Sequence, residues 1–350
     1  MFLLDNLFGL FSHDIGIDLG TANTLVYVRG KGIMLREPTI LTRHKKTKKV
    51  LAVGGEAKKM LGKTPMNIIS IRPLRDGVIS DLEAAEALLR YFVTRVHENP
   101  SRFPKVPRPK VVVGIPSGVT EVERRAVRDA VMRAGAREVF LIEEPMAAAI
   151  GANLPVHDPR GSMIVDIGGG TTEIAVISLG GVVVAKSIRV AGDEMDQDII
   201  NYARARYNLL LGEKSAEEAK IAGGSAYPTK AETRLTLRGR DLASGLPSVI
   251  QVSSGEIREA MAETMNTILA AIKEIIEETP PELVGDLLQS GIVITGGGAL
   301  LPGIKELVER ETKMPVTIDD DPLTTVVKGT GKLLDEPQLL ESMKITAGLG

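Results

Sequence analysis

The chain has 350 residues, which at roughly 150 residues per domain indicates about two domains. Charged residues make up 25% and hydrophobic residues 43% of the sequence, as in a soluble protein with a large core. The net charge of −2 gives no overall attraction to nucleic acid, and the absence of cysteine excludes disulfides, thiolate nucleophiles and cysteine-bearing zinc sites. Any chemistry therefore depends on carboxylates, hydroxyls, backbone amides and a bound cofactor.

The first predicted element is an apolar N-terminal segment, residues 1–12, which is too short to span a bilayer. It lacks the basic region and the cleavage site of a secretory signal. On a helix its apolar side chains share one arc, as in an amphipathic helix at a membrane surface, although Lys and Arg are missing from its polar face. A terminal segment docked on the domain core explains the pattern equally well. The candidate membrane residues are Phe2, Leu3, Leu4, Leu7, Phe8, Leu10 and Phe11.

Two segments of the chain repeat one glycine-bearing pattern. Residues 15–28 read IGIDLGTANTLVYV, and residues 163–177 read MIVDIGGGTTEIAVI. Each predicts an apolar strand ending near an aspartate (Asp18 or Asp166), a turn of small polar residues, and a second strand. Glycine lets several backbone N–H groups approach one anion, and an aspartate beside phosphates requires a divalent cation between them. The repeat therefore predicts two similar domains that hold a nucleotide with Mg²⁺.

Between the two hairpins, the segment LIEEPMAAA (141–149) carries two adjacent carboxylates. Glu143 and Glu144 are adjacent at the end of a predicted strand, so their side chains are expected to point to opposite faces. Only one of them can then face a ligand bound on a given side of the sheet. The other is expected to be a solvated or salt-bridged carboxylate at the strand end.

A third glycine cluster follows in the segment IVITGGGALLPGIKELV. An apolar strand (292–295) runs through Gly296 to Gly298 into a helical pattern, and such a turn lets a flat ring or a sugar approach the backbone. The spacing G-x-x-x-x-G-K-[ST] does not occur in the sequence, which excludes a P-loop NTPase. Each cluster alone is as consistent with a plain turn as with a binding site, and the three together favour a nucleotide site.

The remaining pattern is that of an α/β protein. Helix-period stretches at 81–96 and 254–278 alternate with apolar strands at 111–115 and 139–142. The basic run Arg43–Lys49 is expected to be a solvated hairpin turn, because no aromatic residues are interleaved with it as in a nucleic-acid site.

Taken together, these motifs resemble the actin-like ATPases, the superfamily of actin, heat-shock chaperone ATPases and sugar kinases. The similarity is closest to the MreB family of bacterial cell-shape proteins and runs over nearly the whole chain. The segments that carry it are IDLGTANTLVYV (17–28), RPLRDGVISD (72–81), GAREVFLIEEPMAAAIG (135–151), VDIGGGTTEIAVISLGG (165–181), GSAYP (224–228) and VITGGGALLPG (293–303).

The resemblance implies an actin-like fold, in which two duplicated α/β domains surround a nucleotide cleft and each carries a smaller subdomain. The first domain would comprise 13–154 plus 329–350, with a subdomain at about 32–73. The second would comprise 155–328, with a subdomain at about 191–250.

The resemblance also implies roles for the residues of the three clusters. Asp18 and Asp166 would face Mg²⁺ through water, and Glu144, with Thr171, would position the attacking water. Glu217 and Lys220 resemble a pair that contacts ribose, with a surface ion pair as the alternative. The residues that would bind ATP or ADP are Gly20, Thr21, Ala22, Asn23, Gly168, Gly169, Gly170, Thr171, Thr172, Gly296, Gly297, Gly298 and Ala299.

In function, the resemblance implies slow ATP hydrolysis that controls assembly into paired head-to-tail filaments at the inner face of the cell membrane. The implied partners are further copies of the chain, inner-membrane lipids and membrane proteins of cell-wall elongation, and not nucleic acid. A second membrane candidate is Phe103, flanked by basic residues in the loop ENPSRFPKVPRPK. Arg102 replaces one of the two apolar residues that relatives carry there, and a proline-stiffened connection is the alternative. A small-molecule kinase, a chaperone ATPase and a filament without turnover are the rival functions.

Overall fold

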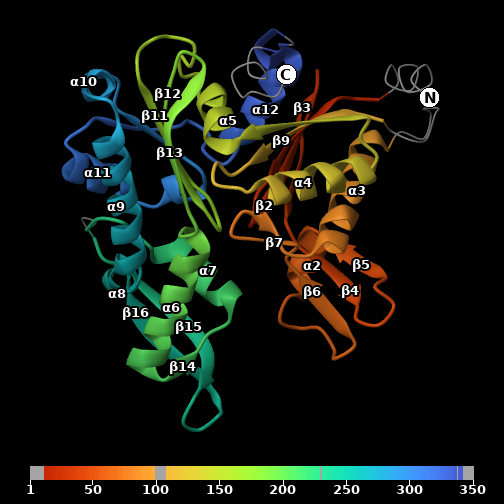
Figure 1. Ribbon diagram of the computed structural model, residues 1–350. Helices are drawn as coiled ribbons and strands as arrows, with labels where there is room; N and C mark the ends of the chain where they lie inside the picture. Colours follow the sequence, from red (N-terminus) through yellow and green to blue (C-terminus); the bar gives the residue numbers. More distant parts are fainter. Residues whose placement is uncertain (1–11, 99–107, 229–230, 337, 342–350) are drawn as a thin grey trace. The chain divides into compact units, whose positions relative to one another are not determined.

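The computed structural model describes residues 12–98, 108–228, 231–336 and 338–341 (Figure 1). They form two compact units, each built around a five-stranded sheet. The first unit comprises the described residues of Met1–Pro159, Ile177–Val183 and Leu323–Gly350, and the second those of Arg160–Val176 and Val184–Pro322.

The sheet of the first unit combines a hairpin with parallel strands. Strands β1 and β2 are antiparallel, and β9 lies parallel to both β1 and β10. The three central strands, β1, β2 and β9, carry largely buried apolar residues, as expected of strands that are covered on both faces. In spatial order the strands are β10 (Glu138–Glu143), β9 (Lys110–Ile115), β1 (Ile15–Leu19), β2 (Asn23–Val28) and β3 (Gly32–Pro38).

Alternation along β1 assigns its residues to two faces of this sheet. Ile15, Ile17 and Leu19 belong to one buried cluster with side chains of α3 (Leu82–His97) and α4 (Glu121–Arg133). Gly16 lies on the opposite face, against α12 (Thr325–Asp335). Asp18 shares that face with Gly16, because successive side chains of a strand point to opposite sides.

Helices α12 and α5 (Glu144–Gly151) cross at unusually close range within the first unit. A Cβ atom added to Gly151 would overlap the carbonyl oxygen of Thr325, and one added to Gly329 would overlap that of Ala147. Two glycines therefore let the backbones of the two helices touch.

A small three-stranded sheet extends the first unit. It comprises β5 (Val50–Val53), β4 (Leu41–His44) and β6 (Ile68–Ile71), accompanied by α2 (Gly55–Met60) and the hairpin of β7 (Leu74–Arg75) and β8 (Val78–Ile79). The predicted basic hairpin is confirmed for residues 45–49, which are exposed between β4 and β5. It is wrong for Arg43, which is buried in β4 and lies 2.7 Å from Asp81.

The sheet of the second unit has the same order of connections as the first. Its hairpin strands β11 and β12 continue into β13, while β17 and β18 are added in parallel beside β11. The predicted duplication of an α/β sheet is therefore confirmed. In spatial order the strands are β13 (Gly181–Ile188), β12 (Thr172–Ser178), β11 (Ser162–Ile167), β17 (Ile292–Thr295) and β18 (Val316–Ile318).

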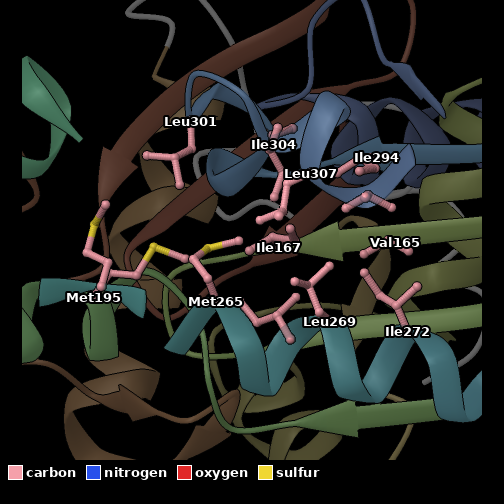
Figure 2. Packing of buried hydrophobic residues seen from close by; sticks show 14 of the residues in the cluster. Val165, Ile167, Met195, Met265, Leu269, Ile272, Ile294, Leu301, Ile304 and Leu307 are labelled. Atoms are coloured by element: carbon pink, nitrogen blue, oxygen red, sulfur yellow. The ribbon is translucent and has the colours of Figure 1, made fainter. Parts of the chain in front are cut away.

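One apolar core holds the helices of the second unit against this sheet (Figure 2). Met265, Leu269 and Ile272 lie on consecutive turns of α9 (Ala262–Glu278), opposite Val165 of β11. The helix predicted over 254–278 is interrupted at the buried Met261, so α8 (Ser254–Ala260) and α9 are separate. The remaining helices packed around this core include α6 (Gly192–Tyr207), α7 (Glu213–Gly223), α10 (Pro281–Ser290) and α11 (Ile304–Thr312).

A second three-stranded sheet belongs to the second unit and consists of β14 (Leu209–Leu210), β15 (Arg234–Asp241) and β16 (Pro247–Ser253).

None of the helices in the described ranges is long and apolar enough to cross a membrane.

Candidate nucleotide site

The first glycine hairpin, between β1 and β2, is a tight turn held by its own backbone. A Cβ atom at Gly20 would lie 2.7 Å from the carbonyl oxygen of Asn23, so the turn requires glycine there. The hydroxyl of Thr39 donates a hydrogen bond of 2.6 Å to the carbonyl of Gly20. The backbone N–H of Gly77 donates to the hydroxyl oxygen of Thr21 at 3.1 Å. Two segments outside the hairpin therefore fix its shape.

Asp18 and Glu144 meet at the same end of the first sheet. Asp18 is paired in register with Gly114 of β9, and a Cβ atom at Gly114 would lie 3.3 Å from Cγ of Glu144. Glu144 is buried as the first residue of α5, after β10 has ended at Glu143. The expectation that both glutamates end a strand is therefore wrong for Glu144. This residue belongs to α5, and its side chain lies against Gly114.

Glu143 has a structural partner. Its carboxylate lies 3.0 Å from the guanidinium of Arg124 on α4, at side-chain exposures of 30% and 25%. The salt-bridged alternative for Glu143 is thus confirmed, and it leaves Glu144 as the candidate for positioning water.

Burial at the end of β1 raises the pKa of Asp18 to about 7, because desolvation destabilises the charged carboxylate. A divalent cation beside it would favour the ionised form, so the environment of Asp18 fits Mg²⁺. The described ranges contain no cluster of three or more His, Cys, Asp or Glu side chains that could hold a metal directly. A cation beside the single carboxylate of Asp18 would be bound largely through water and phosphate.

The second glycine hairpin, between β11 and β12, is closed by a hydrogen bond of 2.9 Å from Gly168 N to Thr171 O. Thr171 is buried in this turn. Thr172 is fully buried, and its hydroxyl donates to the carbonyl of Val190 at 2.8 Å. The hydroxyl of Thr172 is thus bonded to the segment between β13 and α6, whereas its neighbours 168–171 form the turn itself.

The third glycine cluster packs directly on the second hairpin. Gly296 has φ +81°, and a Cβ atom there would overlap the carboxylate of Asp166 and the carbonyl of Ile167. A Cβ atom at Gly298 would overlap the side chain of Ile167. Ala299 is buried in the short 3₁₀ helix Gly297–Leu300 that follows. The second unit therefore brings Asp166, the hairpin and the predicted adenosine-binding glycines together.

Lys220 also lies near this hairpin, because it contacts the N-terminus of α6. The sequence motifs did not indicate that α6 begins there. The N-terminus of α6 is bonded to the turn by Gly192 N to Gly168 O at 3.2 Å and Asp193 N to Gly169 O at 2.7 Å. The Nζ atom of Lys220 donates to the carbonyl of Gly192 at 2.7 Å. The signal that could have found this element is the glycine at a helix start in AGDEMD (191–196).

The structure thus places the predicted residues in two groups. In the first unit, Glu144 and Asp18 lie together, and Gly20–Asn23 continue from the strand that carries Asp18. In the second, Asp166, residues 168–172, Lys220 and residues 296–299 lie together, with Glu217 three residues before Lys220 on α7. The membrane candidates at residues 2–11 and Phe103 fall outside the described residues.

Duplicated sheets with a glycine hairpin on each are the arrangement of the actin-like proteins, and comparison with solved structures agrees. The crystal structure of MreB 5 of Spiroplasma citri bound to AMPPNP matches with a TM-score of 0.88 at 39% identity, covering 95% of this chain and 98% of that one. The MamK double helical filament matches with a TM-score of 0.79 at 23% identity over 93% of this chain and 99% of that one, and shows the fold alone.

The chain belongs to the MreB/Mbl family, whose model matches residues 12–342. It is 51% identical to the cell shape-determining protein MreB of Escherichia coli K12 over 95% of this chain and 96% of that protein. It is 46% identical to the cell shape-determining protein Mbl of Bacillus subtilis 168, over 96% of this chain and 100% of that protein. The actin-like fold and the family predicted from the motifs are thereby confirmed.

Proposed function

We propose that this protein is a cytoskeletal ATPase that sets rod cell shape by assembling into filaments at the cell membrane. The observation that carries the proposal is the duplicated glycine hairpin, with an aspartate at each copy and Glu144 over Gly114 beside one of them. Relatives that share about half of its residues are named as cell shape-determining proteins. A related structure, 39% identical, is described as bound to AMPPNP and another as bound to ADP, which supports an adenine nucleotide as the ligand.

The residues divide the work of binding and hydrolysis. The backbone N–H groups of residues 20–23 and 168–171 would hold the phosphates, and residues 296–299 the adenosine. Asp18 and Asp166 would hold Mg²⁺ through water, and the ion would neutralise phosphate charge. Glu144 would orient the attacking water, with Thr171 as a second contact to the water or the γ-phosphate. Phosphoryl transfer depends mainly on such positioning and charge stabilisation, so few residues suffice.

Hydrolysis in this proposal is slow and acts as a timer for assembly. Head-to-tail contacts between copies generate an open filament, because the same heterologous surface is used at every junction and never closes. Two such protofilaments would pair at the inner face of the membrane. The N-terminal residues 1–11 and the loop around Phe103 would attach them to lipid, and proteins of cell-wall elongation would follow the filament.

The experiment that tests the proposal is co-sedimentation with anionic liposomes in the presence of ATP and Mg²⁺, followed by electron microscopy of the pellet. We expect membrane-bound filaments from the full chain and unattached filaments from a chain that lacks residues 1–11. Filaments that attach equally well after truncation would assign attachment to the Phe103 loop. A failure to polymerise, combined with ATP turnover that depends on a small-molecule acceptor, would overturn the proposal in favour of a kinase.

A further inference from the structure

A buried ion pair joins α6 to α7 beside the second glycine hairpin. The Nζ atom of Lys220 lies 2.9 Å from Oδ1 of Asp196, and the two side chains are 17% and 15% exposed. Burying both charges is costly unless the geometry is good and further hydrogen bonds are made. Lys220 meets that condition through its 2.7 Å bond to the carbonyl of Gly192.

The pair holds the ammonium group where α6 meets the hairpin. A Cβ atom at Gly192 would lie 3.2 Å from the carbonyl of Gly168 and 3.3 Å from Nζ of Lys220, so the three groups are neighbours. An ammonium group has three N–H donors, of which Lys220 uses one in the hydrogen bond to Gly192, while Asp196 lies within ion-pair distance. The position of the ammonium group beside Gly192 and Gly168 would let a further donor serve a phosphate or ribose oxygen of a nucleotide bound at residues 168–171.

The surroundings of Asp196 are acidic apart from Lys220. Asp193 on α6 and Glu217 on α7 both act on Asp196 as like charges, whereas the charge and hydrogen bond of Lys220 favour its ionised form. Burial is the largest effect and raises the pKa of Asp196 to about 6. A negative group beside a polyphosphate site is unfavourable in itself, and the positive charge of Lys220 at 2.9 Å offsets it.

We infer that Asp196 is a positioning residue for nucleotide binding, which in its ionised form holds the Lys220 ammonium group at the glycine hairpin. The inference rests on the proposed nucleotide site and adds a regulation to it. When Asp196 binds a proton, the charge-assisted bond to Lys220 is lost and the ammonium group is no longer fixed at the hairpin. Nucleotide affinity therefore decreases as the pH falls.

The test measures the Kd of the full chain for a fluorescent ADP analogue with Mg²⁺ between pH 5 and pH 8. For D196N we expect about tenfold weaker binding than wild type at pH 7.5, since a charge-assisted hydrogen bond is replaced by a neutral one. The wild type should approach D196N at pH 5. The nucleotide's own titration is common to all variants, so the difference between the two profiles isolates Asp196.

Two further variants make the result specific. K220A should weaken binding, and D196N should have no further effect in that background, because Asp196 acts through Lys220. The matched control is D198N on the same helix, whose carboxylate instead accepts a 2.6 Å hydrogen bond from Thr264. D198N should bind as the wild type does at every pH.

The inference is overturned if folded D196N binds as the wild type does across the pH range, or if its effect adds fully to that of K220A. If D196N does not fold, the pH profiles of Kd for wild type and K220A are compared. Parallel profiles overturn the inference. A weakening of binding towards acid pH that occurs in wild type and not in K220A supports it. Absence of nucleotide binding by the wild type at every pH would instead overturn the proposed function.

Discussion

The guanidinium of Arg43 lies 2.7 Å from the carboxylate of Asp81, across 38 positions of the sequence. The other oxygen of Asp81 accepts a hydrogen bond of 2.9 Å from Ala84 N and so caps helix α3. One carboxylate therefore ties the small sheet of the first unit to the start of α3. Since the Arg43 side chain is only 9% exposed, water cannot easily replace the partner that Asp81 provides.

Removing this carboxylate should destabilise the protein. For D81A we expect a loss of about 3 kcal/mol in the free energy of unfolding, because the buried guanidinium of Arg43 loses its 2.7 Å partner, is left with Glu83 at 3.7 Å, and α3 loses its cap. D81N retains a capping oxygen and should lose about half as much. Chemical denaturation followed by circular dichroism gives both values. Equal losses for the two variants would show that the cap contributes nothing.

The glycines at the crossing of α5 and α12 should be intolerant of any side chain. G329A places a methyl group onto the carbonyl of Ala147, so we expect a loss of about 3 kcal/mol in the free energy of unfolding. G285A is the matched control, because Gly285 lies in α10 with open space around its Cβ position. That variant should gain about 0.5 to 1 kcal/mol from its higher helix propensity. A thermal melt of each variant separates the two outcomes.

The proposed catalytic role of Glu144 predicts a selective loss of activity. E144Q should reduce the rate of ATP hydrolysis about 100-fold and leave the affinity for ADP unchanged, because the amide cannot accept a proton from water. E143Q is the control, since Glu143 pairs with Arg124 and takes no part in the proposed chemistry. Phosphate release and ADP binding are measured on the same preparations. A larger loss for E143Q than for E144Q would reverse the assignment.

Asp196 should also leave a signature in stability. Its pKa is raised from 3.8 to about 6 in the folded protein, so the folded state binds more protons than the unfolded state between these values. The contribution of Asp196 to stability is therefore greatest at low pH and falls as the pH rises from about 4 to about 6, by at most about 3 kcal/mol. D196N should lack this component. Denaturation of both proteins at pH 4.5 and pH 7 measures the difference, and identical pH dependence would contradict the assignment.

Local pattern was enough to predict the hairpins, because apolar strands, aspartate and glycine occur there within 15 residues of each other. It was also enough for the start of α3, where Asp81 caps the helix. The partner of Arg43 could not be predicted, since a basic run indicates exposure and the carboxylate that buries Arg43 is distant in sequence. No glycine or proline stands at Met261, so the sequence pattern does not predict the break between α8 and α9. Because Met261 is fully buried, we attribute the break to packing.

In the candidate site, too, local motifs predicted some features, and contacts between distant residues determined others. Glycines and aspartates of the motifs identified the turns, whereas the face to which Glu144 points depends on whether β10 ends before or after it. No sequence motif indicated Asp196 as a site residue, because its proposed role depends on Lys220, which lies on another helix. Contacts between separate elements are what a reading of local spacing cannot supply.

The position of α12 in the chain determines the order in which the protein can be completed during synthesis. Helix α12 packs against α5 and β1 in the first unit, yet its residues follow the whole of the second unit in sequence. A ribosome therefore releases every residue of the second unit before the first unit can acquire α12. During that interval Gly151 of α5 and Gly16 of β1 lack the helix that packs against them, so this part of the first unit is completed last.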